Sequence, residues 1–242
     1  MKRIDRIISE QTNYSRKEIK SLISKKKITV DDTIVKKPEE KYDESKVIIK
    51  IDGNELVIKD HIYLILNKPE GYVSATEDEN DKTVLELVPE KFNKKNIFPV
   101  GRLDKDTTGL LILTDDGEFS HNILAPNKHV KKAYEVELDI EVTKEMVDGF
   151  KSGVKLNDGV CKEASLEITG EKTAIVTITE GRYHQIKRMF GCYEAKVVEL
   201  ERIQIGEFKL PEELQQGDYR ELTEEELELI KKWNKNWYIF VL

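Results

Sequence analysis

The sequence contains only two cysteines and no long apolar segment. Cys161 and Cys192 cannot form a disulfide framework and do not have the spacing of metal ligands, so we expect a reducing compartment and no metal site. The longest apolar runs, around residues 62–66 and 237–242, are too short to cross a bilayer, and no signal-peptide pattern opens the chain. We therefore expect a cytoplasmic protein.

Internal repeats, low-complexity linkers and the glycine-rich phosphate loop of nucleotide-binding proteins are also missing from the sequence. The 242 residues are 36% charged and 38% hydrophobic, a balance that suits one large globular domain or two unequal ones. Strand and helix patterns are mixed, and several connections have hairpin length. This arrangement favours an α+β fold with a mixed, largely antiparallel sheet.

Charge is distributed unevenly along the chain. The net charge is −7 and the pI is near 5.4, which argues against a protein that coats nucleic acid with its whole surface. Residues 1–30 nevertheless contain nine lysines and arginines against three acidic residues, whereas the segment from residue 207 onward is rich in glutamate. A basic end on an acidic chain indicates a localised anionic partner, although a solvated lysine-rich surface would give the same pattern.

The basic N-terminal segment has the pattern of a small helical module. Residues 3–10 carry isoleucines at i, i+3 and i+4, which predicts a short helix. Ser15 and Glu18 form a capping-box sequence, so a second helix is predicted to begin there. Its first turns carry three cations that suit phosphate oxygens, namely Arg16, Lys17 and Lys20.

Two short strands are predicted to complete this module. They cover residues 28–35 and 47–51, and residues 52–54 form a turn that we expect to lead out of the module. We therefore place a small domain at residues 1–59 and a larger domain at residues 60–242.

Residues 98–117, which read FPVGRLDKDTTGLLILTDDG, combine a glycine-rich turn with an apolar run. Residues 110–113 predict a core strand, and Asp104 lies in the turn before it, where rigid scaffold would hold a carboxylate facing outward. Gly109 indicates a special backbone conformation or a close approach of another segment. Asp104 is our first candidate for a catalytic carboxylate, although Asp and Gly also build ordinary turns beside core strands.

Two further polar residues lie next to predicted apolar faces. Residues 131–138 alternate as a strand and place Tyr134 on the buried face, where a core tyrosine is the alternative to a functional one. Lys187 lies beside a helical stripe, so its stem can follow apolar surface while its ammonium reaches a buried anion. The stripe, which we expect to be core rather than binding surface, comprises Ile186, Met189, Phe190 and Tyr193.

Five segments of the chain carry a family resemblance. In order they are LNKPEGYVSA, GRLDKDTTGLLILTDDG, KKAYEVEL, EGRYHQIKRMF and VVELERIQIG. They resemble the motifs of the RsuA-like branch of the pseudouridine synthases. The N-terminal segment resembles the small RNA-binding module, also found in a small-subunit ribosomal protein, that this branch carries. The resemblance covers nearly the whole chain and implies an α+β synthase domain after an RNA-binding domain.

The resemblance also implies a role for each candidate residue. Asp104 is the nucleophile of the family, and its carboxylate would fit equally well as the base that removes a sugar proton. Lys187 is the cation expected to form a buried ion pair with Asp104. Tyr134 stacks on the uracil after it leaves the RNA stack, Leu200 packs against the other side of the base, and Arg102 helps to hold the flipped conformation.

The sequence therefore predicts a ribosomal RNA pseudouridine synthase, which needs no redox cofactor because the isomerisation exchanges no electrons. We expect a monomer that does not bind membranes and that acts on 16S ribosomal RNA within a subunit or an assembly intermediate. The alternatives are the same reaction on 23S ribosomal RNA, a non-catalytic ribosome-assembly protein, and a glycosidase, which would need a second paired acid. His184 is assigned a structural or RNA-contacting part, and further RNA contacts are expected from Arg3, Arg6, Ser15, Arg16, Lys17 and Lys20.

Overall fold

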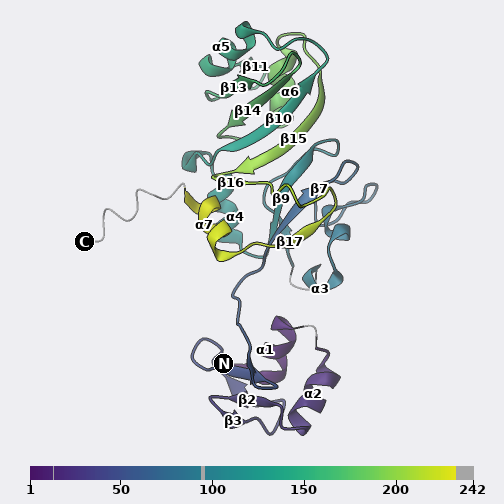
Figure 1. Cartoon of the computed structure of the whole chain (residues 1–242), viewed down its shortest axis with the longest axis vertical. Helices are drawn as coiled ribbons and strands as arrows, with labels where there is room; N and C mark the ends of the chain where they lie inside the picture. The colour runs from purple at the N-terminus through teal and green to yellow at the C-terminus, as the bar shows by residue number, and fades with distance from the viewer. Residues whose placement is uncertain (13, 94–95, 233–242) are drawn as a thin grey trace, which may run out of the picture. The chain divides into compact units, whose positions relative to one another are not determined.

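The computed structural model describes residues 1–12, 14–93 and 96–232, so the apolar run at residues 237–242 lies outside the described residues. The chain divides into two compact units, Met1–His61 and Ile62–Leu242 (Figure 1). Over the described ranges, no helix is both long and apolar enough to cross a membrane.

The first unit packs two helices against a small sheet. Its apolar stripe is fully buried, as predicted, with Ile4, Ile7 and Ile8 in one core together with isoleucines of the second helix and the strands. The capping box is confirmed, because the Ser15 side chain accepts from the Glu18 amide while the Glu18 carboxylate accepts from the Ser15 amide. The elements are α1 (Ile4–Gln11), α2 (Arg16–Ser24), the sheet β3-β2-β5-β6 (Thr33–Ile34, Ile28–Val30, Ile49–Ile51, Asn54–Glu55) and the pair β1-β4 (Lys2–Arg3, Lys41–Tyr42).

Two sequence predictions for this unit are wrong. The strand predicted at residues 28–35 is a hairpin, because Asp31 and Asp32 both adopt left-handed backbone conformations that reverse the chain between β2 and β3. The turn at residues 52–54 does not lead out of the unit, since it connects β5 to β6 within the same sheet.

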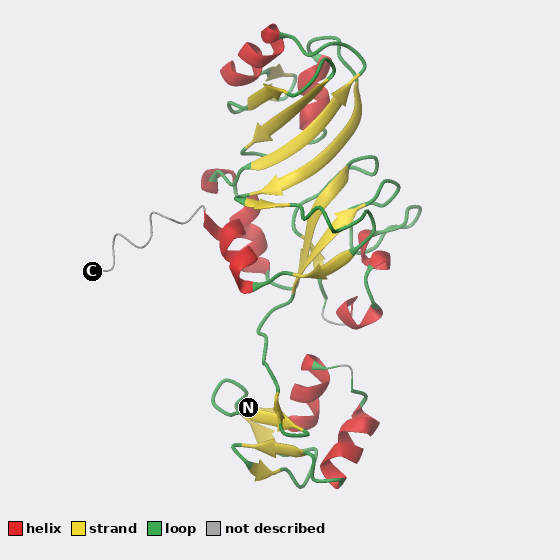
Figure 2. Ribbon diagram, viewed as in Figure 1, coloured by secondary structure: helices red, strands yellow, loops and turns green. Residues whose placement is uncertain are grey.

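The second unit is built on a nine-stranded sheet (Figure 2). Its main path is β13-β14-β10-β15-β9-β7-β17, in which β9 and β15 pair in parallel and the other neighbours are antiparallel. The predicted α+β class with a mixed, largely antiparallel sheet is therefore confirmed. The strands are β7 (Tyr63–Lys68), β8 (Phe98–Pro99), β9 (Thr108–Thr114), β10 (Lys132–Leu138), β13 (Ser165–Ile168), β14 (Thr173–Ile178), β15 (Val197–Ile205), β16 (Phe208–Lys209) and β17 (Tyr219–Glu221).

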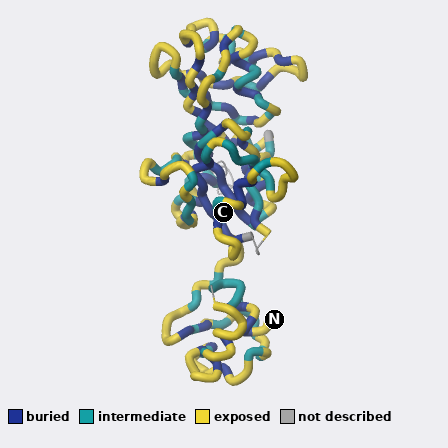
Figure 3. The backbone as a smooth tube through the Cα atoms, turned by 90° about the vertical axis from the view of Figure 1, so that its right-hand side faces the viewer, coloured by how far each residue is buried: buried dark blue, intermediate teal, exposed yellow. Residues whose placement is uncertain are grey.

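Helices cover both faces of this sheet, and buried stretches run along its central strands (Figure 3). Neighbouring residues of β7 and β9 belong to two different hydrophobic clusters, which explains why both strands are continuous apolar runs rather than alternating ones. One cluster includes α5 and α6, and the other includes α4 and α7. The remaining elements are α3 (Glu90–Asn93), α4 (Gly117–Leu124), α5 (Lys144–Ser152), α6 (Gln185–Gly191), α7 (Glu224–Lys231), η1 (Val84–Leu87), η2 (Pro126–Lys128) and the hairpin β11-β12 (Lys155–Leu156, Gly159–Val160).

Helix α6 buries three residues of the predicted apolar stripe, Ile186, Met189 and Phe190, whereas Tyr193 lies beyond the end of the helix and is only partly buried. Met189 and Phe190 are fully buried, and the Phe190 ring lies 4.7 Å from the ring of Phe150 in α5. Burial of such side chains contributes about 1.5–3 kcal/mol each. This packing fixes α6, and with it the position of Lys187, against the sheet.

Candidate active site

The loop that carries Asp104 is held by the segment that follows β7. The Leu103 amide donates to Ser74 Oγ at 3.0 Å, and Ser74 Oγ in turn donates to the Leu103 carbonyl at 3.0 Å. The Gly71 amide donates to the Lys105 carbonyl at 2.9 Å. Two segments about thirty residues apart in sequence therefore fix the backbone on both sides of Asp104.

Lys68 also holds this loop, in addition to Ser74 and Gly71. The sequence analysis missed it. Its side chain is fully buried, and burial lowers the pKa of Lys68 to about 8 against the opposite effect of nearby carboxylates. The available signal was a lysine that directly continues the apolar strand at residues 62–66. Its Nζ donates to the carbonyl oxygens of Pro69 (3.1 Å), Lys105 (3.3 Å) and Thr107 (2.7 Å).

Gly109 allows β9 to approach β15. It has φ +96°, and a Cβ atom at this position would lie only 2.4 Å from the Arg202 carbonyl oxygen. The parallel pairing of β9 with β15, which joins the two halves of the sheet, therefore requires glycine here. The predicted close approach is confirmed.

Asp104 lies beside two basic side chains. Lys187 Nζ is 3.7 Å from Asp104 Oδ2, and His184 Nε2 is 3.4 Å from Asp104 Oδ1. Lys187 lies closer to a second carboxylate, since its Nζ donates to Asp106 Oδ1 at 2.5 Å. Burial alone would raise the pKa of Asp106, but the hydrogen bond and charge of Lys187 hold it below its usual range.

The expected Lys187–Asp104 ion pair is present, but the expectation that it is buried is wrong. The two atoms are within ion-pair reach, but the side chains of Lys187 and Asp104 remain 25% and 31% exposed. The pair is also shared with Asp106, a residue that the sequence analysis did not single out. The physical reason is that α6 buries its apolar stripe and leaves Lys187 at the edge of the core, where solvent reaches both carboxylates.

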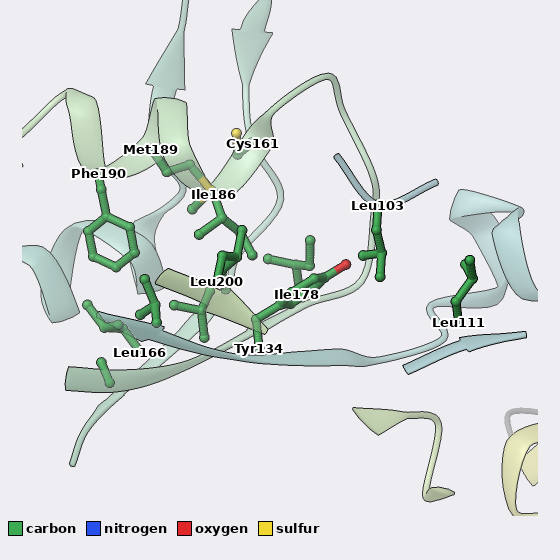
Figure 4. Packing of buried hydrophobic residues seen from close by; sticks show 14 of the residues in the cluster. Leu103, Leu111, Tyr134, Cys161, Leu166, Ile178, Ile186, Met189, Phe190 and Leu200 are labelled. Carbon is green, nitrogen blue, oxygen red and sulfur yellow. The ribbon is translucent and has the colours of Figure 1, made fainter. Parts of the chain in front are cut away.

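A cavity of about 600 Å³ opens beside Asp104. Tyr134 and Leu200 line it and are each only 7% exposed. The Tyr134 ring extends from β10 toward Leu103, with Leu200 and Ile178 nearby (Figure 4). The cavity thus places a carboxylate, a cation and an aromatic wall around a space large enough for a planar ring. This arrangement suits attack on, or proton removal from, a ligand whose ring lies against Tyr134.

Two buried cations, Lys132 and Arg202, also line this cavity, and the sequence analysis missed both. Lys132 precedes Tyr134 by two residues in β10, so the same alternation that placed Tyr134 on the buried face could have found it. Arg202 lies opposite Tyr134 in β15. In the part of the chain that the structure describes, no three His, Cys, Asp or Glu side chains are grouped closely enough to hold a metal ion.

The remaining predicted residues lie on exposed surface. Arg102 lies at the cavity and is exposed. In the first unit, Arg3 pairs with Asp5 and Arg6 pairs with Glu10. Ser15 is used as a helix cap. Three exposed side chains form no hydrogen bond or ion pair among the residues described, namely those of Arg16, Lys17 and Lys20.

Comparisons with known proteins agree with this organisation. Residues 62–191 match the family model of RNA pseudouridylate synthase, and residues 2–48 match that of the S4 domain. An uncharacterized RNA pseudouridine synthase, YtzG of Bacillus subtilis, is 38% identical over 95% of this chain and 98% of its own. The ribosomal small subunit pseudouridine synthase A of Salmonella typhimurium is 41% identical over 93% of this chain and 98% of its own. A crystal structure of a pseudouridylate synthase superposes with a TM-score of 0.68 and 35% identity over 95% of this chain and 100% of that one.

Proposed function

The chain belongs to the RNA pseudouridylate synthase family, and we propose that it isomerises a uridine of small-subunit (16S) ribosomal RNA with Asp104 as the catalytic carboxylate. The observation that carries the assignment of Asp104 is its position. Its carboxylate stands at a cavity walled by Tyr134 and Leu200, with the Lys187 ammonium 3.7 Å away. The small-subunit substrate rests on the relatives that are named for that activity.

The reaction breaks the bond between C1′ of the sugar and N1 of uracil, turns the ring, and joins C1′ to C5. Asp104 acts either by attacking C1′ or by removing a sugar proton, and both roles require the ionised carboxylate. Lys187 and His184 place a cation and an imidazole nitrogen beside this carboxylate, at 3.7 Å and 3.4 Å. The isomerisation involves no net oxidation or reduction, so nucleophilic and acid–base side chains of this chain can carry out the reaction.

Tyr134 and Leu200 bind the base in this proposal. A uridine that leaves the RNA stack loses stacking energy, and an aromatic face can return about 1–3 kcal/mol of it. Tyr134 offers such a face, with Leu200 on the same side of the sheet. Arg102 lines the cavity and is exposed, so in this proposal it contacts RNA outside the cavity.

The first unit contacts the RNA backbone in this proposal. It matches the S4 domain model, and Arg16, Lys17 and Lys20 present uncompensated charge along the N-terminal turns of α2. The arginines already paired with acids, Arg3 and Arg6, contribute less because their charge is offset.

The decisive variant is Asp104→Asn, which keeps the side-chain shape and removes its charge and nucleophilicity. We expect it to fold and bind RNA but to make no pseudouridine, measured by nucleoside analysis of 16S and 23S transcripts after digestion. Glu118→Gln, an exposed carboxylate of α4, is the matched control and should retain full activity. Turnover by Asp104→Asn would refute the catalytic assignment, and modification of only the 23S transcript by the wild-type protein would refute the substrate.

A further inference from the structure

Two buried cations line the cavity beside Asp104. Lys132 is 7% exposed and Arg202 is 2% exposed. Among the residues that the structure describes, neither forms an ion pair. Lys132 Nζ donates only to the Val130 carbonyl, at a long 3.4 Å, and Arg202 Nε donates to the Leu110 carbonyl at 2.7 Å. Arg202 Nη2 is buried without a hydrogen-bond partner.

Burying two cations without ion-pair partners costs free energy. Lysine and arginine are almost never fully buried unless they are paired, because removing a charge from water is not repaid without a partner. Burial lowers the pKa of Lys132 to about 8, and the charge of Arg202 acts in the same direction. The two cations are therefore placed to interact with negative charge on a substrate that binds in the cavity.

The position of the two cations identifies which part of a substrate they meet. Arg202 lies directly opposite Tyr134 in the β10–β15 pairing, and Lys132 is two residues from Tyr134 on the same face. Leu200 shares that face. Lys132 and Arg202 are buried at least as deeply as Tyr134 and Leu200, whereas Arg102 is exposed. They therefore lie beside the base-binding walls rather than along the path of the phosphodiester backbone.

The proposed reaction creates negative charge at this place. Whether Asp104 attacks C1′ or removes a sugar proton, the C1′–N1 bond breaks and its electron pair leaves with the uracil. The freed ring carries a negative charge spread over N1, O2 and O4. If Asp104 attacks C1′, C5 then bonds to C1′ and displaces the carboxylate. If Asp104 removes a sugar proton instead, that proton returns to the sugar as C5 bonds to C1′. In both routes the C5 proton passes to a base and N1 gains a proton, so the product is an isomer of the substrate.

We propose that Lys132 and Arg202 form a cationic site that stabilises the uracil ring as it departs from the sugar. This inference rests on the proposed function and adds two catalytic residues to it. Preorganised groups aimed at developing charge in a water-poor cavity act mainly on the transition state and little on the bound substrate. The two residues should therefore affect the chemical step rather than RNA affinity.

The test uses full-length protein in single-turnover reactions on the 16S transcript. Lys132→Met removes the charge and keeps an unbranched side chain, and we expect its rate constant to fall about 100-fold while RNA affinity stays within two-fold. Lys132→Arg should recover most of the rate because it restores the charge. The control is Lys131→Met, the exposed neighbour on the same chain segment, which should behave as wild type. Thermal melting of each variant establishes that it is folded.

A leaving-group comparison separates this role from a structural one. The 4-thiouracil ring is a better leaving group than uracil, so the deficit of Lys132→Met should shrink several-fold on RNA that carries 4-thiouridine at the target position. An equal deficit on both substrates, or an unchanged rate in Lys132→Met, would overturn the inference while leaving the proposed function intact. A loss of RNA affinity at an unchanged rate constant would overturn it in favour of a phosphate contact. If wild-type protein modified neither transcript, the proposed function itself would fail, and the inference with it.

Discussion

At the scale of single residues, the Asp104 loop is held by Lys68, which forms no hydrogen bond or ion pair with the Asp104 side chain among the residues that the structure describes. Lys68 Nζ donates to three carbonyl oxygens, two of which belong to the residues flanking Asp104 and Asp106. Without the ammonium, the Lys105 carbonyl would keep its bond from the Gly71 amide, whereas the Pro69 and Thr107 carbonyls would lose Lys68 as a donor.

We predict that Lys68→Met lowers the free energy of unfolding by about 1–3 kcal/mol, because the buried Thr107 carbonyl and the part-buried Pro69 carbonyl lose the ammonium that donates to them. Urea denaturation measures this change, and turnover should fall as well because the Asp104 loop loosens. The matched control, Lys155→Met, replaces an exposed lysine and should change stability by no more than about 0.5 kcal/mol. A variant at position 68 as stable as wild type would show that burying the ammonium costs as much as its hydrogen bonds return.

Lys187 interacts with both Asp104 and Asp106, which leads to a second prediction for a single residue. Lys187→Met should reduce turnover at least 10-fold, which corresponds to about 1.4 kcal/mol, whereas Lys187→Arg should retain part of it because the charge remains. The same Met variant should raise the pKa of Asp106, since Lys187 is the group that holds it low. Carboxyl NMR titration measures the pKa, and an unchanged value would show that the Lys187–Asp106 bond does not form in solution.

At the scale of elements, the solvent face of the β10–β15 pair carries like charges opposite one another. Glu135 faces Glu201, and Glu137 faces Glu199. Burial, reinforced by the charges of Glu135 and Glu199, raises the pKa of Glu201 above its usual range. Directly opposed like charges destabilise a sheet. The opposite face of these two strands forms the proposed base-binding wall. The β10–β15 pair therefore carries destabilising charge repulsion on one face and the proposed site on the other.

We predict that Glu201→Gln stabilises the protein by about 0.2–1 kcal/mol at pH 7. The folded-state pKa of Glu201 lies above its unfolded value, so the folded state binds the proton more tightly. The associated stability is present below the unfolded pKa and is lost as the pH rises through the folded pKa. The advantage of the variant should therefore grow over that interval in thermal melts. Glu167→Gln on β13, where the residue faces Ile175, should show no such pH-dependent gain.

At the scale of the whole molecule, a basic unit precedes an enzyme unit in a chain of net charge −7. In the proposed function, charge on the first unit attracts the RNA and the enzyme unit acts on the base.

Reversing Arg16, Lys17 and Lys20 to Glu should weaken RNA binding and flatten its salt dependence by up to about three units of the log–log slope, because fewer counterions are released. Binding measured between low and physiological salt tests this prediction. Replacing Arg3 and Arg6 with Gln should have a smaller effect, since each already pairs with an acid. Equal slopes for wild type and the triple variant would show that these lysines and arginines only keep the protein soluble.

The sequence by itself determined the features that depend on neighbouring residues. The capping box at Ser15 was readable because a helix start is satisfied by residues three positions away. The α6 stripe followed from helical periodicity. Asp104 stood out because its turn and the apolar run behind it are contiguous, and the order of the five motifs carried the family.

Only the tertiary structure decided which distant groups converge on Asp104. Lys132 and Arg202 come from two separate strands and line the same cavity as Asp104, while Lys68 of a third strand holds the Asp104 loop, and no local pattern states this. The structure also shows that Lys187 interacts with two carboxylates, those of Asp104 and Asp106, and that the Lys187–Asp104 pair is partly exposed. Burial and charge depend on the packing of elements far apart in the chain, so periodicity could place these residues on a face but could not say what that face would meet.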